Sequence, residues 1–309
     1  MVAWTAAVPC AIWALIRVLG FESGFPLVPA MAYTVYVIPF AVLATLVAAV
    51  LRRWVPAAVA AAAALALIAV VAPRAVGGPD DVEGRSLRVL SSNVLRGGAE
   101  VDQLIALIEE RDVEVLTLQE VTPEFRDEFE EAGGGRLLPH SALAVREGVS
   151  GSAIYSRYPL EPGPEGEYAT QNRATARIAP GLSVGIFSAH PILPSTAANI
   201  EDWKEGLRAM PGPGFEGVPW LLLGDFNATL DHAEFRDLLD RGYADAGERM
   251  GEGLRATWPA RRTRGRYLPV TIDHLLFEDD RFGVRDYEVL ELDDTDHRPV
   301  YGELVVKED

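Results

Sequence analysis

Long apolar runs fill the first part of the chain, and short apolar segments between polar ones fill the rest. Residues 2–19, 29–51 and 55–72 are apolar, and most charged residues of this part lie in the connections. A soluble domain would bury such runs as core helices, but three in succession are typical of membrane spans. The pattern therefore predicts three transmembrane helices, which make residues 1–74 a membrane anchor.

Basic residues indicate how this anchor is oriented. Arg52 and Arg53 lie between the second and third runs, which predicts that this connection is cytoplasmic. The rest of the chain then lies outside the cell, and we expect a multi-pass protein of the cell membrane with an extracellular domain. Arg17 and Arg74 fall on the outer side in this arrangement and argue against it. A cleaved signal peptide would account for the first run alone.

The remainder of the chain has the pattern of one α/β domain. Residues 75–85 are polar and rich in glycine, which predicts a linker. From residue 86 to residue 309, short apolar runs typical of strands alternate with segments that have helical spacing. The expected strands are 87–92, 113–118, 152–155, 174–178, 182–188, 220–223, 272–277, 287–292 and 300–306. The expected helices are 101–110, 200–210 and 233–240.

The charge of the predicted α/β domain is strongly negative. The chain has 28 basic and 45 acidic side chains, and only four of the basic and one of the acidic residues lie in residues 1–77. Residues 78–309 therefore carry 24 basic and 44 acidic side chains, a net charge of −20. A tight nucleic-acid binder has the opposite electrostatic character. The single cysteine, Cys10, excludes an intrachain disulfide.

One apolar run leads directly into a polar pair. Asp225 and Asn227 follow the expected strand 220–223, and their two-residue spacing points both side chains to the same side. Ligand sites of open α/β sheets lie at such strand ends. A carboxylate beside a carboxamide suits a divalent cation and a phosphate oxygen. The alternative is a strand followed by an Asx turn and a helix N-cap at Thr229 or Asp231.

Other expected strands also end in metal-binding or acid–base side chains. They are Asn93, Glu120, His190, Asp273 with His274, and Asp296 with His297. Each alone has an ordinary structural explanation as a turn residue, a helix cap, a buried histidine or an ion pair. All of them occurring at strand ends of one domain is much less probable by chance than any one of them alone. His274 follows Asp273 and points to the opposite face of its strand, so we expect a structural role for it.

At these positions the chain resembles the endonuclease/exonuclease/phosphatase family of DNase I-like nucleases, inositol phosphatases and neutral sphingomyelinases. The matching stretches are SSNVLRG, LTLQEV, GSAIYSRYPL, FSAHPI, LLGDFNAT, TIDHLLF and DTDHRPV. They occur in family order over about residues 86–306 and leave the N-terminal runs outside. The resemblance implies an α/β fold, a two-sheet sandwich flanked by helices.

The resemblance also implies a metal site. Glu120 would be the main metal carboxylate, with Asn93 beside it, and Asp296 would be a further ligand. The ion would be Mg²⁺, or Mn²⁺ as an alternative, and it would polarise the phosphoryl oxygen.

Five residues receive catalytic roles from the resemblance. His297 would be the general base for the attacking water or would hydrogen-bond the phosphoryl oxygen, and Asp273 would orient it. Asp225 would position the water or help to protonate the leaving oxygen. Asn227 would donate a hydrogen bond to the phosphate, and His190 would do the same or serve as a general acid.

Arginines are the candidates for substrate binding. Arg173 precedes an expected strand, and residues 255–266 carry five arginines, among them Arg262 and Arg264. Arginine suits phosphate by its fork geometry. The alternative is a solvated loop that balances local acidity.

The leading hypothesis is a membrane-anchored, metal-dependent phosphoesterase that hydrolyses phosphodiester or phosphomonoester bonds. Its substrate would be a lipid head group, a small phosphate or a nucleic acid, and the sequence does not reveal whether it has a protein partner. A nuclease of the same family is the alternative within this class, although the net charge argues mildly against it. A catalytically inactive binding module that keeps the fold is the alternative from another class.

Overall fold

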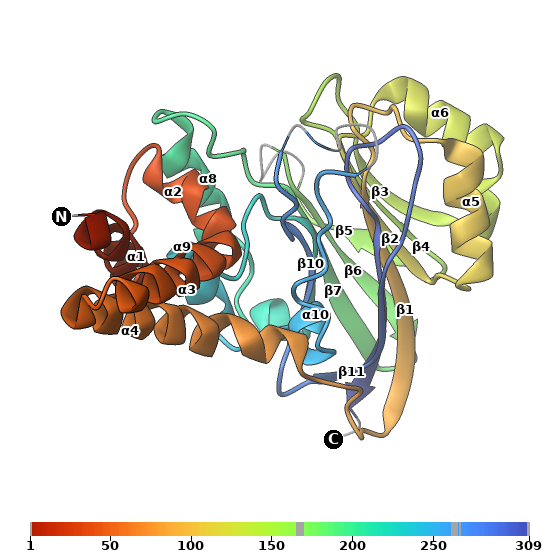
Figure 1. Cartoon of the computed structure of the whole chain (residues 1–309). Coiled ribbons are helices and arrows are strands. Elements are labelled where there is room, and N and C mark those ends of the chain that lie inside the picture. The colour runs from red at the N-terminus through yellow and green to blue at the C-terminus, as the bar shows by residue number, and fades with distance from the viewer. Residues whose placement is uncertain (1, 165–169, 261–264, 266, 308–309) are drawn as a thin grey trace.

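A bundle of helices stands beside a two-sheet sandwich (Figure 1). The computed structural model describes residues 2–164, 170–260, 265 and 267–307. The first sheet has the order β11-β12-β1-β2-β4-β3, and the second has the order β5-β6-β7-β8-β10-β9. This confirms the predicted two-sheet α/β sandwich.

Each sheet is mixed, with one parallel pair at its centre. The first sheet contains β1 (Gly84–Asn93), β2 (Val115–Gln119), β3 (His140–Ala144), β4 (Ser152–Ser156), β11 (Phe282–Val289) and β12 (Val300–Lys307). The second contains β5 (Leu160–Pro162), β6 (Asn172–Ala179), β7 (Leu182–Ala189), β8 (Trp220–Asp225), β9 (Tyr243–Asp245) and β10 (Asp273–Glu278). The pairs β1–β2 and β7–β8 are parallel, so the carboxyl ends of these four strands lie at one edge.

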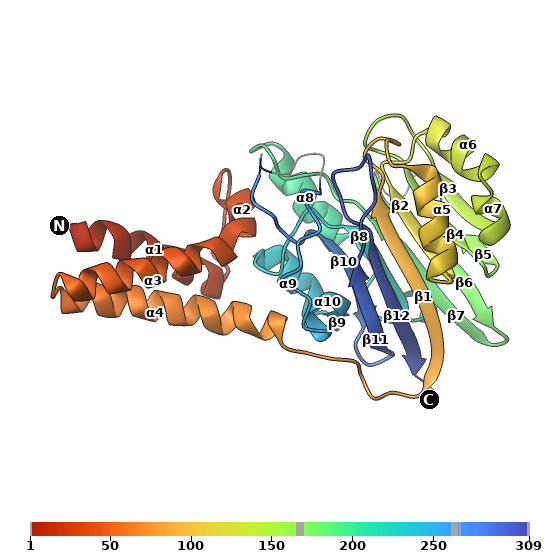
Figure 2. The same cartoon turned by 45° about the vertical axis from the view of Figure 1, so that its right-hand side comes forward.

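Alternating side chains of the central strands build the cores. In β8, Leu221 and Leu223 face the other sheet, whereas Trp220 and Leu222 face the covering helices. Both faces are covered, which explains why this strand appears in the sequence as a continuous apolar run. The first sheet is covered by α5 (Val101–Glu110), α6 (Pro123–Glu131) and α7 (Gly134–Leu137), as Figure 2 shows. The second is covered by α8 (Asn199–Arg208) and α9 (Ala233–Leu239), while α10 (Ala246–Arg249) and η3 (Phe215–Gly217) are short.

The expected strands differ from the observed ones in two respects. β3, β5 and β9 were not expected, because they are short strands at or next to the sheet edges and have little apolar pattern of their own. The strand expected at 287–292 instead spans Phe282–Val289. Leu290 and Leu292 belong to the core under α5 without being part of a strand, so their apolar character reflects packing rather than sheet pairing.

The N-terminal helices follow the predicted apolar runs. The main helices are α1 (Val2–Leu19), α3 (Thr34–Val50) and α4 (Trp54–Val71), with α2 (Leu27–Ala30) and η1 (Met31–Tyr33) between α1 and α3 and η2 (Ala72–Ala75) after α4. Figure 2 shows the three long helices packed side by side. Two segments of the described chain, Leu27–Val50 and Trp54–Ala75, are long and apolar enough to cross a membrane, and α1 is a shorter apolar helix.

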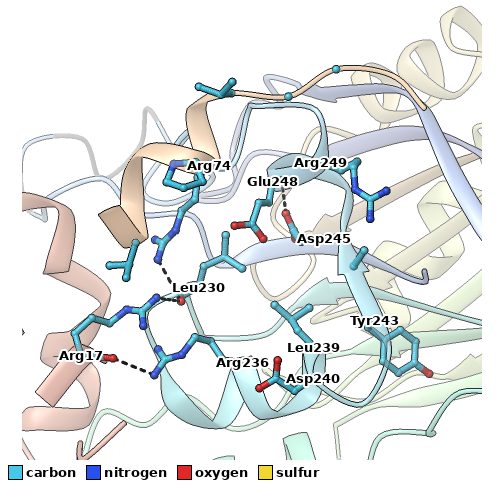
Figure 3. Close-up of a pocket in the computed structure, with 16 residues that line it drawn as sticks. Arg17, Arg74, Leu230, Arg236, Leu239, Asp240, Tyr243, Asp245, Glu248 and Arg249 are labelled. Atoms are coloured by element: carbon cyan, nitrogen blue, oxygen red, sulfur yellow. Dashed lines mark hydrogen bonds between the residues drawn. The ribbon is translucent and has the colours of Figure 1, made fainter. Parts of the chain in front are cut away.

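A buried ion-pair cluster joins the helix bundle to the sandwich. Arg17 Nε lies 2.6 Å from Asp231 Oδ1, and Arg74 Nη2 lies 2.7 Å from the same oxygen. Figure 3 shows Arg74 directed at the carbonyl oxygen of Leu230 and Arg236 donating to the backbone oxygen of Arg17. The ion-paired side chains are nearly inaccessible to water, so their attraction is weakly screened.

The segment between the two parts is attached to the sandwich. Residues 76–83 form no helix or strand, and β1 begins at Gly84. Asp80 exchanges two hydrogen bonds with the backbone of Val284, of 2.8 and 2.9 Å, and its carboxylate lies 3.1 Å from Arg249 Nη1. This linker is therefore fixed along β11.

Candidate active site

The sandwich brings the strand-end residues together at one edge. Asn93 and Asp225 are the last residues of β1 and β8, and Asp273 is the first residue of β10. Glu120 and His190 directly follow β2 and β7, while Asp296 and His297 lie in the loop before β12. The parallel pairs direct these strands to one edge, and the antiparallel β10 starts where β8 ends, with Asp273 opposite Asp225.

Asp225 lies at the centre of this group. Its Oδ2 atom lies 3.1 Å from Asn93 Nδ2, 3.7 Å from His297 Nε2 and 3.8 Å from His190 Nε2. Its Oδ1 atom accepts a 2.8 Å hydrogen bond from the backbone of Asn227. Burial raises the pKa of Asp225, and the nearby charge of His297 partly opposes this rise.

Glu120 presents a second buried carboxylate to the same centre. Its Oε1 atom lies 3.3 Å from Asn93 Nδ2 and 3.8 Å from His190 Nε2, and its Oε2 atom accepts from the backbone of Arg96 at 3.0 Å. Burial raises its pKa. Glu120 and Asn227 have φ angles of 61° and 49°, in the left-handed region that costs free energy for residues other than glycine. Such strain is concentrated at functional sites.

The donor set fits a divalent cation. Asp296 Oδ1 is buried and has no hydrogen-bond partner in the described part of the chain, while its Oδ2 accepts from Trp258 Nε1 at 3.1 Å. Carboxylate oxygens are the ligands that Mg²⁺ and Mn²⁺ prefer. Asn93 directs its amide nitrogen at Glu120 and Asp225, while its oxygen accepts from the backbone of Leu95, so it would ligate a cation only after the amide turns over.

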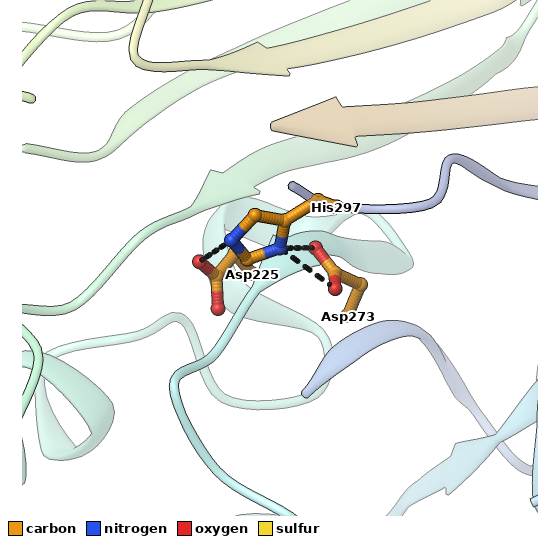
Figure 4. A group of neighbouring side chains, drawn as sticks. All are labelled: Asp225, Asp273 and His297. Carbon is orange, nitrogen blue, oxygen red and sulfur yellow. Dashed lines mark hydrogen bonds and ion pairs between the residues drawn. The ribbon is translucent and has the colours of Figure 1, made fainter. Parts of the chain in front are cut away.

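His297 and Asp273 form a hydrogen-bonded pair. His297 Nδ1 lies 3.1 and 3.0 Å from the two oxygens of Asp273, which leaves Nε2 directed at Asp225 (Figure 4). Burial alone would lower the pKa of His297, but the charges of Asp273 and Asp225 raise it to about 10. Asp225, Asp273 and His297 could also hold a cation, since their ligand atoms lie within 4.8 Å of one another. A cation on Nδ1 would have to replace the hydrogen bond to Asp273.

The comparison with protein families agrees with this geometry. The model of the Endonuclease/Exonuclease/phosphatase family matches residues 90–297, which is more than half of the chain. The chain belongs to this family. The match begins within β1 and ends at His297, so it contains the whole edge at which the site residues meet.

Solved structures of the family share the fold. An endonuclease/exonuclease/phosphatase from Beutenbergia cavernae is 19% identical with a TM-score of 0.54, and 72% of each chain is covered. Bacteroides thetaiotaomicron mannosyl-6-phosphatase is 20% identical with a TM-score of 0.51, covering 71% of this chain and 99% of that one. D. rerio TDP2 in complex with a single-strand DNA product is 16% identical with a TM-score of 0.55, covering 71% and 98%. A search of curated proteins found no match. Family members and neighbours are hydrolases of phosphoester bonds, and family members are typically dependent on a divalent metal.

The remaining predicted residues lie as follows. His190 is buried, which lowers its pKa, and Asn227 donates to the carbonyl of Pro191 at 3.0 Å at the border of the site. His274 bonds Asp245 at 2.8 Å and the carbonyl of Ala228 at 3.0 Å on the far face of β10, as expected for a structural residue.

Of the three arginines predicted to bind substrate, Arg173 alone lies among the described residues, and its side chain is directed away from this site. Arg173 is buried on β6, where it pairs with Glu216 at 3.0 Å and lies 5.1 Å from the centroid of the Phe215 ring. It is absent from the described lining of the cavity at the site. The position of Arg173 at the start of a strand does not reveal to which face of the sheet its side chain points. In the structure, Glu216 and the Phe215 ring hold this side chain. Arg262 and Arg264 lie outside the described residues.

A cavity of about 800 Å³ opens over the site. Its lining includes Glu120, His190, Asp225, Asn227, Asp296 and His297. Trp258 also lines it and had no functional signal in the sequence beyond its place in the arginine-rich stretch. Pro29, Ala30 and Tyr33 of the N-terminal helices line it as well. No pattern could have revealed them, because they reach the site only through the packing of the bundle on the sandwich.

Proposed function

We propose that the chain is a membrane-anchored, divalent-metal-dependent hydrolase of phosphate esters. The proposal rests on the convergence of Glu120, Asp225 and Asp296 with two histidines on one buried centre beneath a cavity. Buried carboxylates this close repel one another unless a cation or protons offset their charge. Metal-assisted hydrolysis uses such a centre, since the cation both neutralises the carboxylates and acts on the phosphate.

The metal ligands in this proposal are Glu120 and Asp296, with Asn93 after its amide has turned over. The Oδ1 atom of Asp296 supports this assignment: among the described residues it has no hydrogen-bond partner and only a 3.9 Å contact with His297 Nε2, and a buried oxygen without a donor is costly unless a ligand satisfies it. A Mg²⁺ or Mn²⁺ ion held by these residues would supply Lewis-acid chemistry, polarising a phosphoryl oxygen and stabilising the charge that develops on it.

Residues of the chain position and protonate the reacting groups. Asp273 holds the proton on Nδ1 of His297, so that Nε2–H of the cationic ring can donate to a phosphoryl oxygen. Asp225, 3.7 Å from Nε2, positions the attacking water and accepts its proton, and it returns this proton to the leaving oxygen as the bond between phosphorus and that oxygen breaks. His190 and Asn227 donate hydrogen bonds to the other phosphate oxygens.

The packing of the helix bundle supports membrane anchoring. Buried Ala7, Ala44 and Ala60 meet at the helix contacts, whereas Leu43 and Leu65 have exposed fractions of 57% and 67%. A soluble bundle would bury its large apolar side chains and expose polar ones, whereas here leucines are exposed and alanines are buried. Small residues at helix contacts are typical of membrane helices.

The direction of the bundle is consistent with an extracellular catalytic domain. Arg17 and Arg74 contact the sandwich at one end of the bundle, whereas the α3–α4 connection with Arg52 and Arg53 lies at the opposite end (Figure 2). A cytoplasmic position of that connection would therefore leave the sandwich outside the cell.

The test uses the full chain in detergent micelles with Mg²⁺ and a soluble bis-aryl phosphodiester, and again with chelator. We expect Glu120→Gln and His297→Ala to lower metal-dependent turnover by about 100-fold or more, as loss of a charged catalytic group does. Glu109→Gln on the exposed face of α5 and His140→Ala on β3 are matched controls that should keep full turnover. Equal turnover by Glu120→Gln and Glu109→Gln would contradict the proposal. No turnover by a folded wild-type chain on diesters, monoesters or plasmid DNA would favour the binding module.

A further inference from the structure

One wall of the active-site cavity comes from the membrane anchor. Pro29, Ala30 and Tyr33, from the connection between α1 and α3, line the cavity opposite the sandwich. Neighbouring residues hold this wall in place: Val28 is fully buried in the core under α8 and α9, and Tyr36 donates a 2.7 Å hydrogen bond to the carbonyl of Pro269. The wall is therefore a fixed part of the site.

The facing wall is apolar as well. Ile192, Leu193 and Pro194 follow the strand end that carries His190, and Tyr267 packs on Trp258 with 4.9 Å between ring centroids. Leu193 and Tyr267 each have an exposed fraction of 53%. Exposed apolar groups at the rim of a cavity are unfavourable in water and indicate that an apolar partner covers them.

The cavity is thus amphipathic from floor to mouth. Its floor carries Glu120, Asp225 and Asp296 with two histidines, and its upper walls carry aliphatic and aromatic side chains. A small hydrophilic phosphate ester would leave the apolar walls unfilled. A polynucleotide would bring further phosphates against the acidic surface of a domain with a net charge of −20.

The mouth lies where the chain leaves the predicted membrane. α1 ends at Leu19 and α3 begins at Thr34, so the connecting residues 20–33 lie at one end of the bundle. In this connection Phe21 and Phe25 have exposed fractions of 70% and 54%. Exposed phenylalanines are unfavourable in water, and contact with the apolar part of a bilayer would cover them.

We propose that residues 29–33 of the anchor form half of the substrate site, and that the substrate is an amphiphilic phosphate ester, a membrane lipid with the phosphate in its head group. The phosphate lies on the acidic, metal-binding floor, and the first carbons of the apolar chains lie between Tyr33 and Leu193. This inference rests on the proposed function, because it names the substrate class of the same site.

The test compares substrates that share a head group and differ in chain length. The full chain is reconstituted into vesicles of dioleoyl lipids with choline, ethanolamine, glycerol or inositol phosphate head groups, and is assayed in parallel on soluble dibutyryl lipids with the same head groups. We expect kcat/KM for at least one head group to be about tenfold or more higher for the long-chain lipid, equivalent to about 1.4 kcal/mol of added binding.

Variants of the walls locate the subsite. Leu193→Asp and Ala30→Trp should lower the ratio of kcat/KM between the long-chain and the dibutyryl lipid of the same head group to about one, and the control variants should keep the wild-type ratio. The matched controls are Leu254→Asp, an exposed leucine elsewhere on the sandwich, and Ser23→Trp, an exposed position of the same connection. An advantage that persists in both wall variants would overturn the assignment of this subsite.

The outcomes separate the two proposals. Metal-dependent turnover of the soluble diester without a long-chain advantage overturns the lipid inference and leaves the phosphoesterase intact. Cleavage of plasmid DNA in preference to every lipid also overturns it. Absence of turnover on all substrates overturns both.

Discussion

Removal of the Asp231 carboxylate tests how the N-terminal helix bundle is held on the sandwich. Asp231→Ala leaves Arg17 and Arg74 without their shared partner. The side chains of the two arginines are only 7% and 4% exposed, and that of Asp231 is 3% exposed. Water therefore cannot replace the lost carboxylate without opening the contact between α1, η2 and the loop after β8.

The expected cost follows from this burial. Removal of one partner of a buried ion pair costs about 3–5 kcal/mol, because the remaining charge is buried without compensation. Replacement of the whole cluster by apolar residues avoids this penalty. The variant Asp231→Ala with Arg17→Met and Arg74→Met should therefore be more stable than Asp231→Ala alone. If the triple variant is the more stable of the two, the cost of Asp231→Ala comes from uncompensated charge. If it is the less stable, the cost comes from lost packing.

The measurement is urea unfolding of the full chain in micelles, followed by circular dichroism and tryptophan fluorescence. Asp237→Ala, at an exposed aspartate of α9, is the control and should unfold as the wild type does. The reasoning is refuted if Asp231→Ala unfolds at the same urea concentration as Asp237→Ala. It is also refuted if the apolar triple variant is the least stable of the set.

The same contact has a defined pH dependence. Burial alone would raise the pKa of Asp231, but the hydrogen bonds and charges of Arg74 and Arg17 lower it below the ordinary value of 3.8. A lowered native pKa contributes stability that is present above 3.8 and lost as the pH falls through the native pKa. The difference in unfolding free energy between wild type and Asp231→Ala should therefore shrink in this acidic range.

Two further substitutions test the site and its support. Gly224→Ala should strongly destabilise the chain and abolish turnover, because Gly224 has a φ of 152° and a β-carbon would lie 2.1 Å from the carbonyl oxygen of Ala189; wild-type unfolding and turnover would contradict this. His274→Gln should lower the unfolding free energy by about 3–5 kcal/mol, because Asp245 loses its buried partner. It should leave turnover per folded molecule unchanged, and a selective loss of turnover would show that His274 has more than a structural role.

The sequence predicts the central strands and the site edge because local pattern and local position suffice there. The run 220–223 is buried on both faces, and its apolar character does not depend on what covers it. Asp225 reaches the site because it is the last residue of β8, whereas Asn227 lies beyond the strand in a left-handed conformation and borders the site. Leu290 and Leu292 show where this reasoning ends, since apolar residues also pack under a helix without forming a strand.

Contacts between distant segments could not be predicted from the pattern. Arg173 is of a residue type that often binds phosphate. Its side chain is instead held by Glu216 and Phe215, which lie more than forty residues away in the sequence. From the sequence alone, Arg17 and Arg74 fall on the outer side of the predicted membrane, whereas basic residues are expected on the cytoplasmic side. In the structure they pair with Asp231, so their positions are explained by the contact between the helix bundle and the sandwich.

The linker along β11 restricts what the catalytic domain can reach. A free segment of eight residues would let the domain turn over the bundle and sample a volume about 27 Å in radius. Asp80 and the Arg17–Asp231–Arg74 cluster remove this freedom, so the cavity keeps one height and one direction relative to the helices. With the membrane anchor and the lipid substrate proposed above, such a protein would serve a single leaflet of a sealed bilayer. Its rate would then follow the surface density of substrate in that leaflet, and lipid on the other side would become accessible only after crossing the membrane.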